Sequence, residues 1–196
     1  STDGETWTTQ TNSSPHLIGV TYVNGTFVIV GQNGTILTST DGETWTPQTN
    51  SSPHLIGVTY ANGTFVAVGQ QGTIITSTDG ETWTPQTSGT GSHIRDVTYV
   101  NGTFVAVGHS GAIITSTDGE TWTPQTSGIS SIFFGVTYGN GTFVAVGQQG
   151  TILTSEGASG IVVNNANGLL KLDGTGTVQA AQVTAVSNAG KGLAVN

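Results

Sequence analysis

A heptapeptide, Ser-Thr-Asp-Gly-Glu-Thr-Trp, occurs four times in this chain, at residues 1–7, 39–45, 77–83 and 116–122. Successive copies are 38, 38 and 39 residues apart, measured between Trp7, Trp45, Trp83 and Trp122. A fixed period in this range is typical of solenoids, propellers and other arrays, in which each unit packs on its neighbours. The sequence therefore predicts a series of similar units and disfavours one irregular, enzyme-like core.

One unit, residues 57–87, contains four short segments rich in Val, Ile, Thr and aromatic residues. The breaks between them carry Asn-Gly, Gln-Gly or Asp-Gly, which is typical of hairpin turns. The first break is Asn-Gly in every unit, at 24–25, 62–63, 101–102 and 140–141. Because Asn-Gly accepts the positive φ angles of a type I′ turn, it fixes the register of the two flanking strands. Each unit is thus predicted to be a four-stranded antiparallel meander.

The second strand of each unit is apolar on both faces, because Phe65 and Ala67 alternate with Val66 and Val68. A strand that is buried on both faces must be covered by other sheets, and sheets packed radially around an axis provide that cover. The predicted fold class is therefore all-β, a β-propeller of four blades over residues 1–155. A β-rich tail follows over 156–196, where the aromatic residues and the repeat stop.

The ends of the repeat region are complementary in sequence. Residues 1–10 contain only the fourth strand of a unit, whereas residues 135–155 contain only the first three. We therefore predict that Thr6 and Trp7 pair alongside residues 152–154 and close the ring, which removes an open sheet edge. A larger ring built from two chains, and a piece of a longer propeller, are the alternatives.

The composition narrows the classes of partner. Three basic residues stand against eleven acidic ones, for a formal charge of −8, which opposes binding to nucleic acid or anionic membranes. No run of about 18 apolar residues is present, so membrane insertion is not expected. The absence of cysteine excludes disulfides and thiolate metal sites. These features fit an extracellular or virion surface.

The repeated heptapeptide resembles the Asp-box of sialidase-like propellers, Ser-x-Asp-x-Gly-x-Thr-Trp, with one residue fewer between Asp and Gly. The resemblance implies a structural turn between the third and fourth strands of each blade. Its aspartates should accept backbone N–H groups within their own turns while the tryptophans pack between blades. The structural positions are Asp3, Trp7, Asp41, Trp45, Asp79, Trp83, Asp118 and Trp122. A calcium site at these turns is disfavoured, because the turns should lie far apart at the periphery.

A sialidase-type enzyme is the least favoured function. Such a site needs several arginines for the substrate carboxylate and two facing carboxyl groups, whereas this chain has one arginine, Arg95. Asp96 replaces the glycine found at 19, 57 and 135, and an ion pair with Arg95 is the expected reason. A ring of His16, His54 and His93 could bind a metal, but solvated or packing roles are favoured. No catalytic residue, metal or cofactor is predicted.

Differences among the units concentrate in two connections, the loop before the first strand and the turn after the second. In a meander these lie at the same end of every blade, and loops on a rigid scaffold are where recognition usually resides. Their amides, imidazoles and aromatic rings suit a surface glycan or host receptor. Neutral variation in loops that tolerate change is the alternative. The candidate ligand-binding residues, with Phe133 and Phe134 both expected to be exposed, are His16, Gln32, His54, Gln70, His93, Arg95, His109, Phe133, Phe134 and Gln148.

Residues 168–182, GLLKLDGTGTVQAAQ, resemble a segment of bacteriophage tail-fibre proteins. The resemblance implies a virion component whose residues 156–196 self-associate or attach to another virion protein. Short segments such as 161–163 are too small to form a core alone, so we expect them to pair with other copies or a partner. A linker to another domain is the alternative. The predicted function is a non-enzymatic, surface-displayed binding or decoration module on a fibre or virion. A secreted bacterial adhesin or lectin with the same propeller is the alternative.

Overall fold

The computed structural model describes residues 4–10, 14 and 16–155, together with the backbone of 162–164 and 169–171. The chain separates into two compact units, Ser1–Ser155 and Glu156–Asn196. In the second unit, β16 (Val162–Asn164) and β17 (Leu169–Lys171) form an antiparallel pair. Residues 162–164 therefore pair within the chain with residues 169–171. Most of the predicted attachment segment lies outside the described residues.

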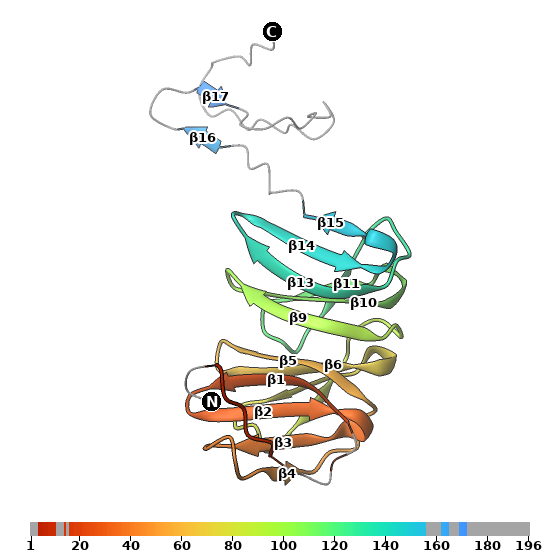
Figure 1. Cartoon of the computed structure of the whole chain (residues 1–196). Helices are drawn as coiled ribbons and strands as arrows, with labels where there is room; N and C mark the ends of the chain where they lie inside the picture. The colour runs from red at the N-terminus through yellow and green to blue at the C-terminus, as the bar shows by residue number, and fades with distance from the viewer. Residues whose placement is uncertain (1–3, 11–13, 15, 156–161, 165–168, 172–196) are drawn as a thin grey trace. The chain divides into compact units, whose positions relative to one another are not determined.

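The first unit is all-β and consists of four antiparallel sheets in chain order (Figure 1). Their first strands are β1 (Leu17–Val23), β5 (Leu55–Ala61), β9 (Ile94–Val100) and β13 (Phe133–Gly139). Their second strands are β2 (Thr26–Gly31), β6 (Thr64–Gly69), β10 (Thr103–Gly108) and β14 (Thr142–Gly147). Their third strands are β3 (Ile36–Ser39), β7 (Ile74–Ser77), β11 (Ile113–Ser116) and β15 (Ile152–Thr154). The first three sheets have fourth strands, β4 (Thr46–Gln48), β8 (Thr84–Gln86) and β12 (Thr123–Gln125).

The hairpin turns follow the sequence prediction. The asparagine of each Asn-Gly pair has a φ of about +50°, and the glycine that follows has a φ near +80°. The second and third strands are joined by one-turn 3₁₀ helices, η1 (Gln32–Gly34), η2 (Gln70–Gly72), η3 (His109–Gly111) and η4 (Gln148–Gly150). The sequence therefore predicted the meander and its turn positions correctly.

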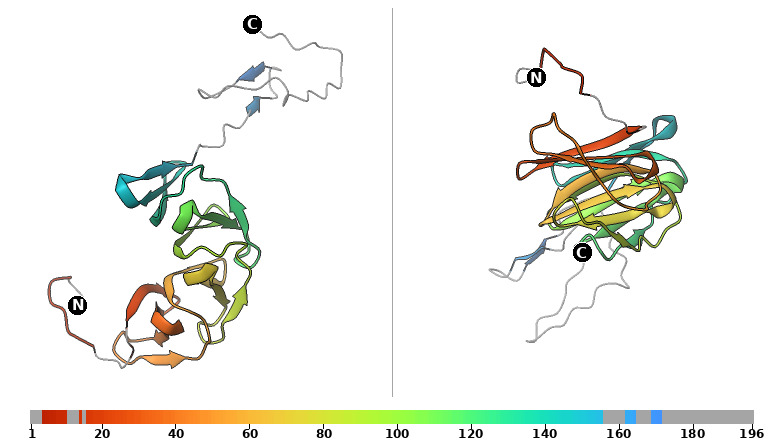
Figure 2. Two further views of the ribbon diagram at one scale, coloured as in Figure 1. Left: turned by 90° about the vertical axis from the view of Figure 1, so that its right-hand side faces the viewer. Right: turned by 90° about the horizontal axis from the view of Figure 1, so that it is seen from below.

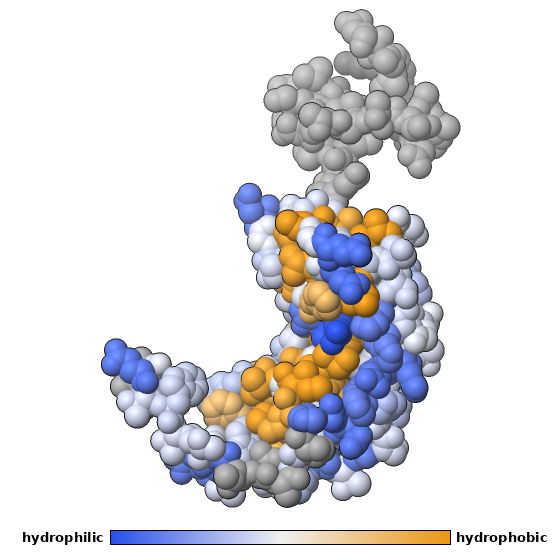
Figure 3. Space-filling model, turned by 45° about the vertical axis from the view of Figure 1, so that its right-hand side comes forward, coloured by the Kyte–Doolittle hydropathy of each residue, from blue (hydrophilic) through white to orange (hydrophobic). Residues whose placement is uncertain are grey.

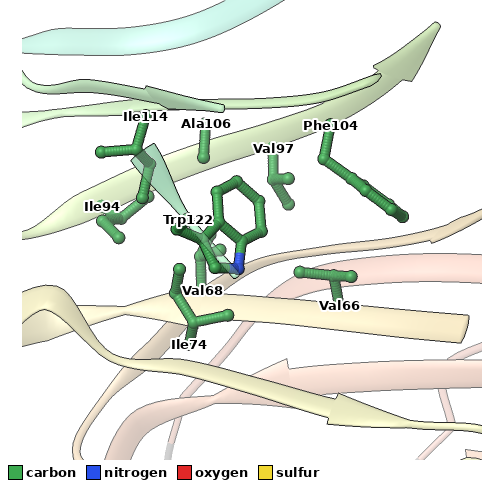
Figure 4. Close-up of a cluster of buried hydrophobic side chains, with 9 residues drawn as sticks. All are labelled: Val66, Val68, Ile74, Ile94, Val97, Phe104, Ala106, Ile114 and Trp122. Atoms are coloured by element: carbon green, nitrogen blue, oxygen red, sulfur yellow. The ribbon is translucent and has the colours of Figure 1, made fainter. Parts of the chain in front are cut away.

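The core lies between successive sheets. Val66 and Val68 of β6, with Ile74 of β7, pack against Phe104 and Trp122 of the third sheet (Figure 4). Equivalent residues form the contacts between the first and second sheets and between the third and fourth. As predicted, the two faces of β6 and of β10 therefore serve two different interfaces.

The predicted closure by residues 1–10 is not present. The last sheet contains β13, β14 and β15 only, and the described residues 4–10 belong to no strand. The sheets follow one another along an arc that leaves its two ends apart (Figure 2, left). The physical reason is that the rotation between neighbouring sheets is set by the side chains packed between them, and three such rotations do not bring β15 to residues 4–10.

Candidate binding surface at the loop end of the sheets

The 3₁₀ turns and the loops that lead into the next sheet lie at one end of the sheets, which we call the loop face. The loop of residues 49–54 reaches η1, because the Asn50 amide nitrogen donates to the Gly34 carbonyl. The next loop crosses η2 so closely that a Cβ on Gly72 would overlap the Thr90 carbonyl oxygen. In the third sheet, the Gly111 N–H donates to the Ser131 carbonyl over 2.7 Å. The predicted coincidence of the two variable connections at one end is therefore confirmed.

The histidines of this face connect turns and loops. The backbone N–H of Asn33 donates to Nδ1 of His54 over 3.2 Å, and that of Gln71 donates to Nδ1 of His93 over 3.1 Å. Each of these imidazoles thus joins the loop before one sheet to the 3₁₀ turn of the preceding sheet. The His16 Nδ1 lies 2.6 Å from Oε1 of Gln32 within the first sheet. No group of three or more His, Asp or Glu residues in the described part of the chain is placed to hold a metal ion.

Gln70 and Gln148 have a backbone role. Each begins a 3₁₀ turn and donates its N–H to the loop before its own sheet, to the carbonyls of His54 and Ile132. His109 occupies the same place in the third sheet and donates to the His93 carbonyl over 2.8 Å. The positions predicted from sequence therefore recur in register around the loop face.

A β-bulge near the start of every first strand determines which side chain is displayed there. In the third sheet Asp96 pairs with Val107 and Ile94 pairs with Gly108, which leaves Arg95 out of the ladder. A bulge re-aims the side chain of the extra residue. The bulge residues of the four sheets are Ile18, Ile56, Arg95 and Phe134.

Because of the bulge, one predicted ligand-binding residue, Phe133, is not exposed. Phe133 is fully buried between the third and fourth sheets, where it takes the place of Leu55 and Ile94 in the preceding sheets. Phe134, the bulge residue, is 49% exposed. The two phenylalanines therefore separate, because only one of them lies outside the alternation of the strand.

The two bulge residues that differ from isoleucine lie together. The guanidinium carbon of Arg95 is 5.4 Å from the ring centroid of Phe134, within the range of a cation–π interaction. The Nε of Arg95 is buried and has no hydrogen-bond partner. The rings of His93 and His109 meet edge to face at 4.8 Å. Burial, followed by the charges of His93 and Arg95, lowers the pKa of His109 below its usual value.

Asp96 does not pair with Arg95, contrary to the sequence prediction. One carboxylate oxygen accepts the N–H of Val97 over 2.9 Å, and the other accepts the N–H of Val136 over 2.8 Å. Asp96 therefore ties the third sheet to the fourth, and the charge of Arg95 is left without that carboxylate. Sequence comparison of the units could have indicated this cluster, since Arg95, Asp96 and Phe134 all depart from positions that are Ile-Gly in the first two sheets.

The opposite end of the sheets carries the carboxylate turns, which we define as residues 39–44, 77–82 and 116–121. In the second of these, Oδ1 of Asp79 accepts the N–H groups of Glu81 and Thr82, each over 2.8 Å. The Ser77 hydroxyl donates to the same oxygen and accepts from Gly80 N–H. Asp41 and Asp118 make the same bonds. The predicted structural role of these three aspartates is confirmed; Asp3 lies outside the described residues.

These bonds lower the pKa values of the turn aspartates. Backbone N–H groups of Thr82 and Glu81, and then the Ser77 hydroxyl, lower the pKa of Asp79 to about 2. The equivalent donors lower the pKa of Asp118 to about 2 and also lower that of Asp41. A carboxylate held in this way is a structural acceptor and a poor general acid.

The tryptophans that follow the turns differ in burial. Trp122 is 6% exposed and packs between the second and third sheets, as predicted, and Trp45 and Trp83 are half-buried. Trp7 is 80% exposed, which contradicts the predicted packing between blades. The indole N–H still donates to the Gly4 carbonyl over 3.0 Å, as that of Trp83 does to Gly80. Trp7 is exposed because the last sheet does not reach it.

Comparison with known proteins agrees with this architecture. The model of the DUF6242 beta propeller domain family matches residues 1–90. No curated protein matches the chain in sequence. The computationally designed protein Ika4 has a TM-score of 0.61 and 13% identity, over 75% of this chain and 94% of Ika4. The fold is thus that of a β-propeller.

Two longer structures are also similar. YCF48 bound to D1 peptide has a TM-score of 0.60 and 21% identity, over 72% of this chain and 50% of that one. The designed protein Ika8 has a TM-score of 0.59 and 12% identity, over 70% of this chain and 45% of Ika8. This chain therefore spans about half the length of these two structures.

No helix among the described residues is long and apolar enough to cross a membrane.

Proposed function

We propose that this protein is a non-enzymatic binding module whose loop face recognises a carbohydrate that carries an acidic group. The observation that supports this proposal is the cluster of Arg95 and Phe134 at adjacent bulge positions. A sugar offers an apolar ring face for stacking and hydroxyls for hydrogen bonds, and an acidic sugar adds a carboxylate or sulfate. Phe134 supplies a half-exposed ring for stacking, and Arg95 supplies the complementary charge.

The electrostatics of the cluster favour an acidic ligand over a neutral one. The chain is acidic overall, with a formal charge of −8, yet both oxygens of the neighbouring Asp96 already accept backbone N–H groups. The guanidinium therefore keeps a positive charge that an anion can neutralise. His93 and His109 lie on the same side and can donate further hydrogen bonds.

The arrangement of carboxylates supports a binding role over hydrolysis. Glycoside hydrolysis generally uses two carboxyl groups that flank one bond. Among the described residues, the carboxylate beside the cluster is that of Asp96. Its two oxygens accept backbone N–H groups of the third and the fourth sheet. The remaining aspartates of the sheets lie in the carboxylate turns at the opposite end. The resemblance of these turns to the Asp-box thus concerns the scaffold, as we interpret it, and not the chemistry of a sialidase.

The tail bears on where the protein would be displayed. The resemblance of residues 168–182 to tail-fibre proteins supports a position on a virion fibre, with the loop face directed toward a host surface glycan. A secreted bacterial adhesin would use the same loop face with a different attachment. Pull-down of virion proteins with residues 156–196 present or deleted separates the two, because only a fibre component requires the tail for incorporation.

A peptide is the second candidate ligand. YCF48, which has a similar fold, was solved with the D1 peptide bound. A propeller of this kind can therefore hold a peptide, and Arg95 would select an acidic one.

The test is a binding measurement by calorimetry with uronic-acid oligosaccharides, their neutral counterparts and acidic peptides. We expect the acidic sugars to bind, and Phe134→Ala and Arg95→Gln each to weaken binding at least about tenfold, roughly 1.4 kcal/mol. Ile56→Ala, at the bulge of the second sheet, is the matched control and should change little. Preference for peptides would favour the second candidate, release of sugar products would show an enzyme, and equal effects of all three variants would reject this site.

A further inference from the structure

The two ends of the arc expose residues equivalent to those that are buried between neighbouring sheets. Inside the arc, Val66, Val68 and Ile74 are at most 1% exposed, because the third sheet covers them (Figure 4). Their counterparts in the last sheet are Val144, Val146 and Ile152, of which Val146 is 46% and Ile152 71% exposed. The last sheet therefore presents an uncovered copy of a face that the next sheet covers in each earlier sheet.

The first sheet presents the other half. Leu55, Phe65 and Ala67 of the second sheet are at most 4% exposed, because they pack on the first sheet. Their counterparts are Leu17, which is 37% exposed, and Phe27 and Ile29, which are half-buried. Val20 on the same sheet is 64% exposed. Figure 3 shows apolar residues gathered on the concave side of the arc and at the end formed by the last sheet.

The missing strand of the last sheet is present in the sequence at the other end of the unit. In the first sheet, β3 pairs with β4 so that Thr38 lies opposite Thr46. The same register applied to β15 places Thr154 opposite Thr8. The segment before Thr8 is already folded as a turn, since the Trp7 indole bonds to Gly4. Residues 8–10 thus have the sequence of a fourth strand, but they belong to no sheet.

A hollow lies between these residues and the first sheet. It has a volume of about 660 Å³ and is lined by Trp7 and Thr8 on one side and by Val20, Phe27 and Trp45 of the first sheet on the other. Exposed apolar side chains such as Val20 and Ile152, beside an unpaired strand edge, are typical of an assembly surface.

We propose that two copies of this chain close into one ring of eight sheets. The free face of the last sheet of each copy packs on the first sheet of the other, and residues 8–10 of each copy add the fourth strand to the other copy's β15. The chain's own three interfaces use equivalent residues and therefore set similar rotations, which leave the arc open (Figure 2). A second copy completes the ring without changing that rotation.

One further observation and one argument from symmetry favour a second copy over closure within one chain. The arc superposes on nearly the whole of Ika4 but on 45% of Ika8, so an arc of this curvature also occurs as about half of a longer chain. In addition, a two-fold axis places each free face opposite its complement at both seams, which gives a closed assembly and leaves no edge.

The test uses disulfide trapping, because the full chain has no cysteine. We expect a mixture of two single variants, Thr8→Cys and Thr154→Cys, to form a disulfide-linked dimer under mild oxidation, while each variant alone does not. The double variant should also run as a covalent dimer on a non-reducing gel. Thr38→Cys with Thr46→Cys, an opposed pair within the first sheet, is the matched control and should form a link within one chain.

The other results overturn the proposal. A double variant that links only within single chains would show that the ring closes with four sheets. Failure of the mixture to link, while the control pair links, would show that the ends do not meet, and a ladder of larger products would show an open chain of copies. Native mass spectrometry should give twice 19.9 kDa for the unmodified chain. Ile152→Glu, at a position exposed in the single chain, should shift it to a folded monomer, whereas Thr84→Glu should not.

Discussion

Single residues hold the carboxylate turns, and the serine that begins each turn is the most buried of their polar groups. Ser77 is 4% exposed, and its hydroxyl bonds to the carboxylate of Asp79 and the N–H of Gly80. We expect Ser77→Ala to lower the free energy of unfolding by about 1–3 kcal/mol, because it leaves a buried N–H without an acceptor. Urea denaturation measures this loss. The neighbouring Thr78→Ala, on an exposed side chain, should change stability by less than about 0.5 kcal/mol.

The aspartates of the same turns predict how stability depends on pH. The donors around Asp79 and Asp118 lower the pKa of each to about 2 from 3.8. Since the folded-state pKa is depressed, the stabilisation is complete above pH 3.8 and is lost as the pH falls toward 2. The difference in unfolding free energy between the wild type and Asp79→Asn should therefore shrink across that range. A difference that is constant from pH 6 to pH 2 would contradict this assignment.

At the scale of elements, two kinds of turn require glycine for different reasons. In the first three 3₁₀ turns the neighbouring loop leaves no room for a side chain, whereas in the hairpin turns only the backbone conformation favours glycine. Gly72 and Gly63 have φ angles of +71° and +80°. A Cβ on Gly72 would overlap the Thr90 carbonyl, whereas one on Gly63 would meet nothing within 4 Å. Gly63→Ala should thus cost about 1–2 kcal/mol, the conformational cost, and Gly72→Ala clearly more. Equal losses in thermal unfolding would show that the loop moves aside.

The elements also show how far sequence rules extend. Strands, Asn-Gly turns and carboxylate turns follow from local residue chemistry, and the structure has them where the sequence predicted. The separation of Phe133 from Phe134 depends on a bulge, which shifts the alternation by one residue and carries no local sequence signal. The acceptor role of Asp96 depends on Val136, forty residues away. Contacts of this kind arise from the packing of whole sheets.

The closure of the ring is a property of the whole molecule and was the least predictable feature. It depends on the accumulated rotation of successive sheets, and a hydrophobic pattern specifies which faces pack without specifying the angle between them. The pattern did identify the complementary ends, since residues 1–10 and 135–155 together contain one full unit.

Association through the arc's ends predicts a thermal stability that depends on protein concentration. A ring of two copies unfolds to two chains, so its midpoint rises with concentration. We expect a higher midpoint when the concentration is raised about a hundredfold, and no such rise for Ile152→Glu. Differential scanning calorimetry at several concentrations measures both. An equal rise in the two proteins would assign the association to another surface.

The bulge residue of each sheet stands outside the hydrogen-bonded ladder, so it can change without loss of strand pairing. The same position already carries isoleucine twice, arginine once and phenylalanine once on nearly identical scaffolds. Duplication of a unit would thus add one more display position on the same face. Several weak contacts on one rigid body raise the effective concentration of each, so avidity for a repetitive ligand can evolve by copying units without improving any single contact.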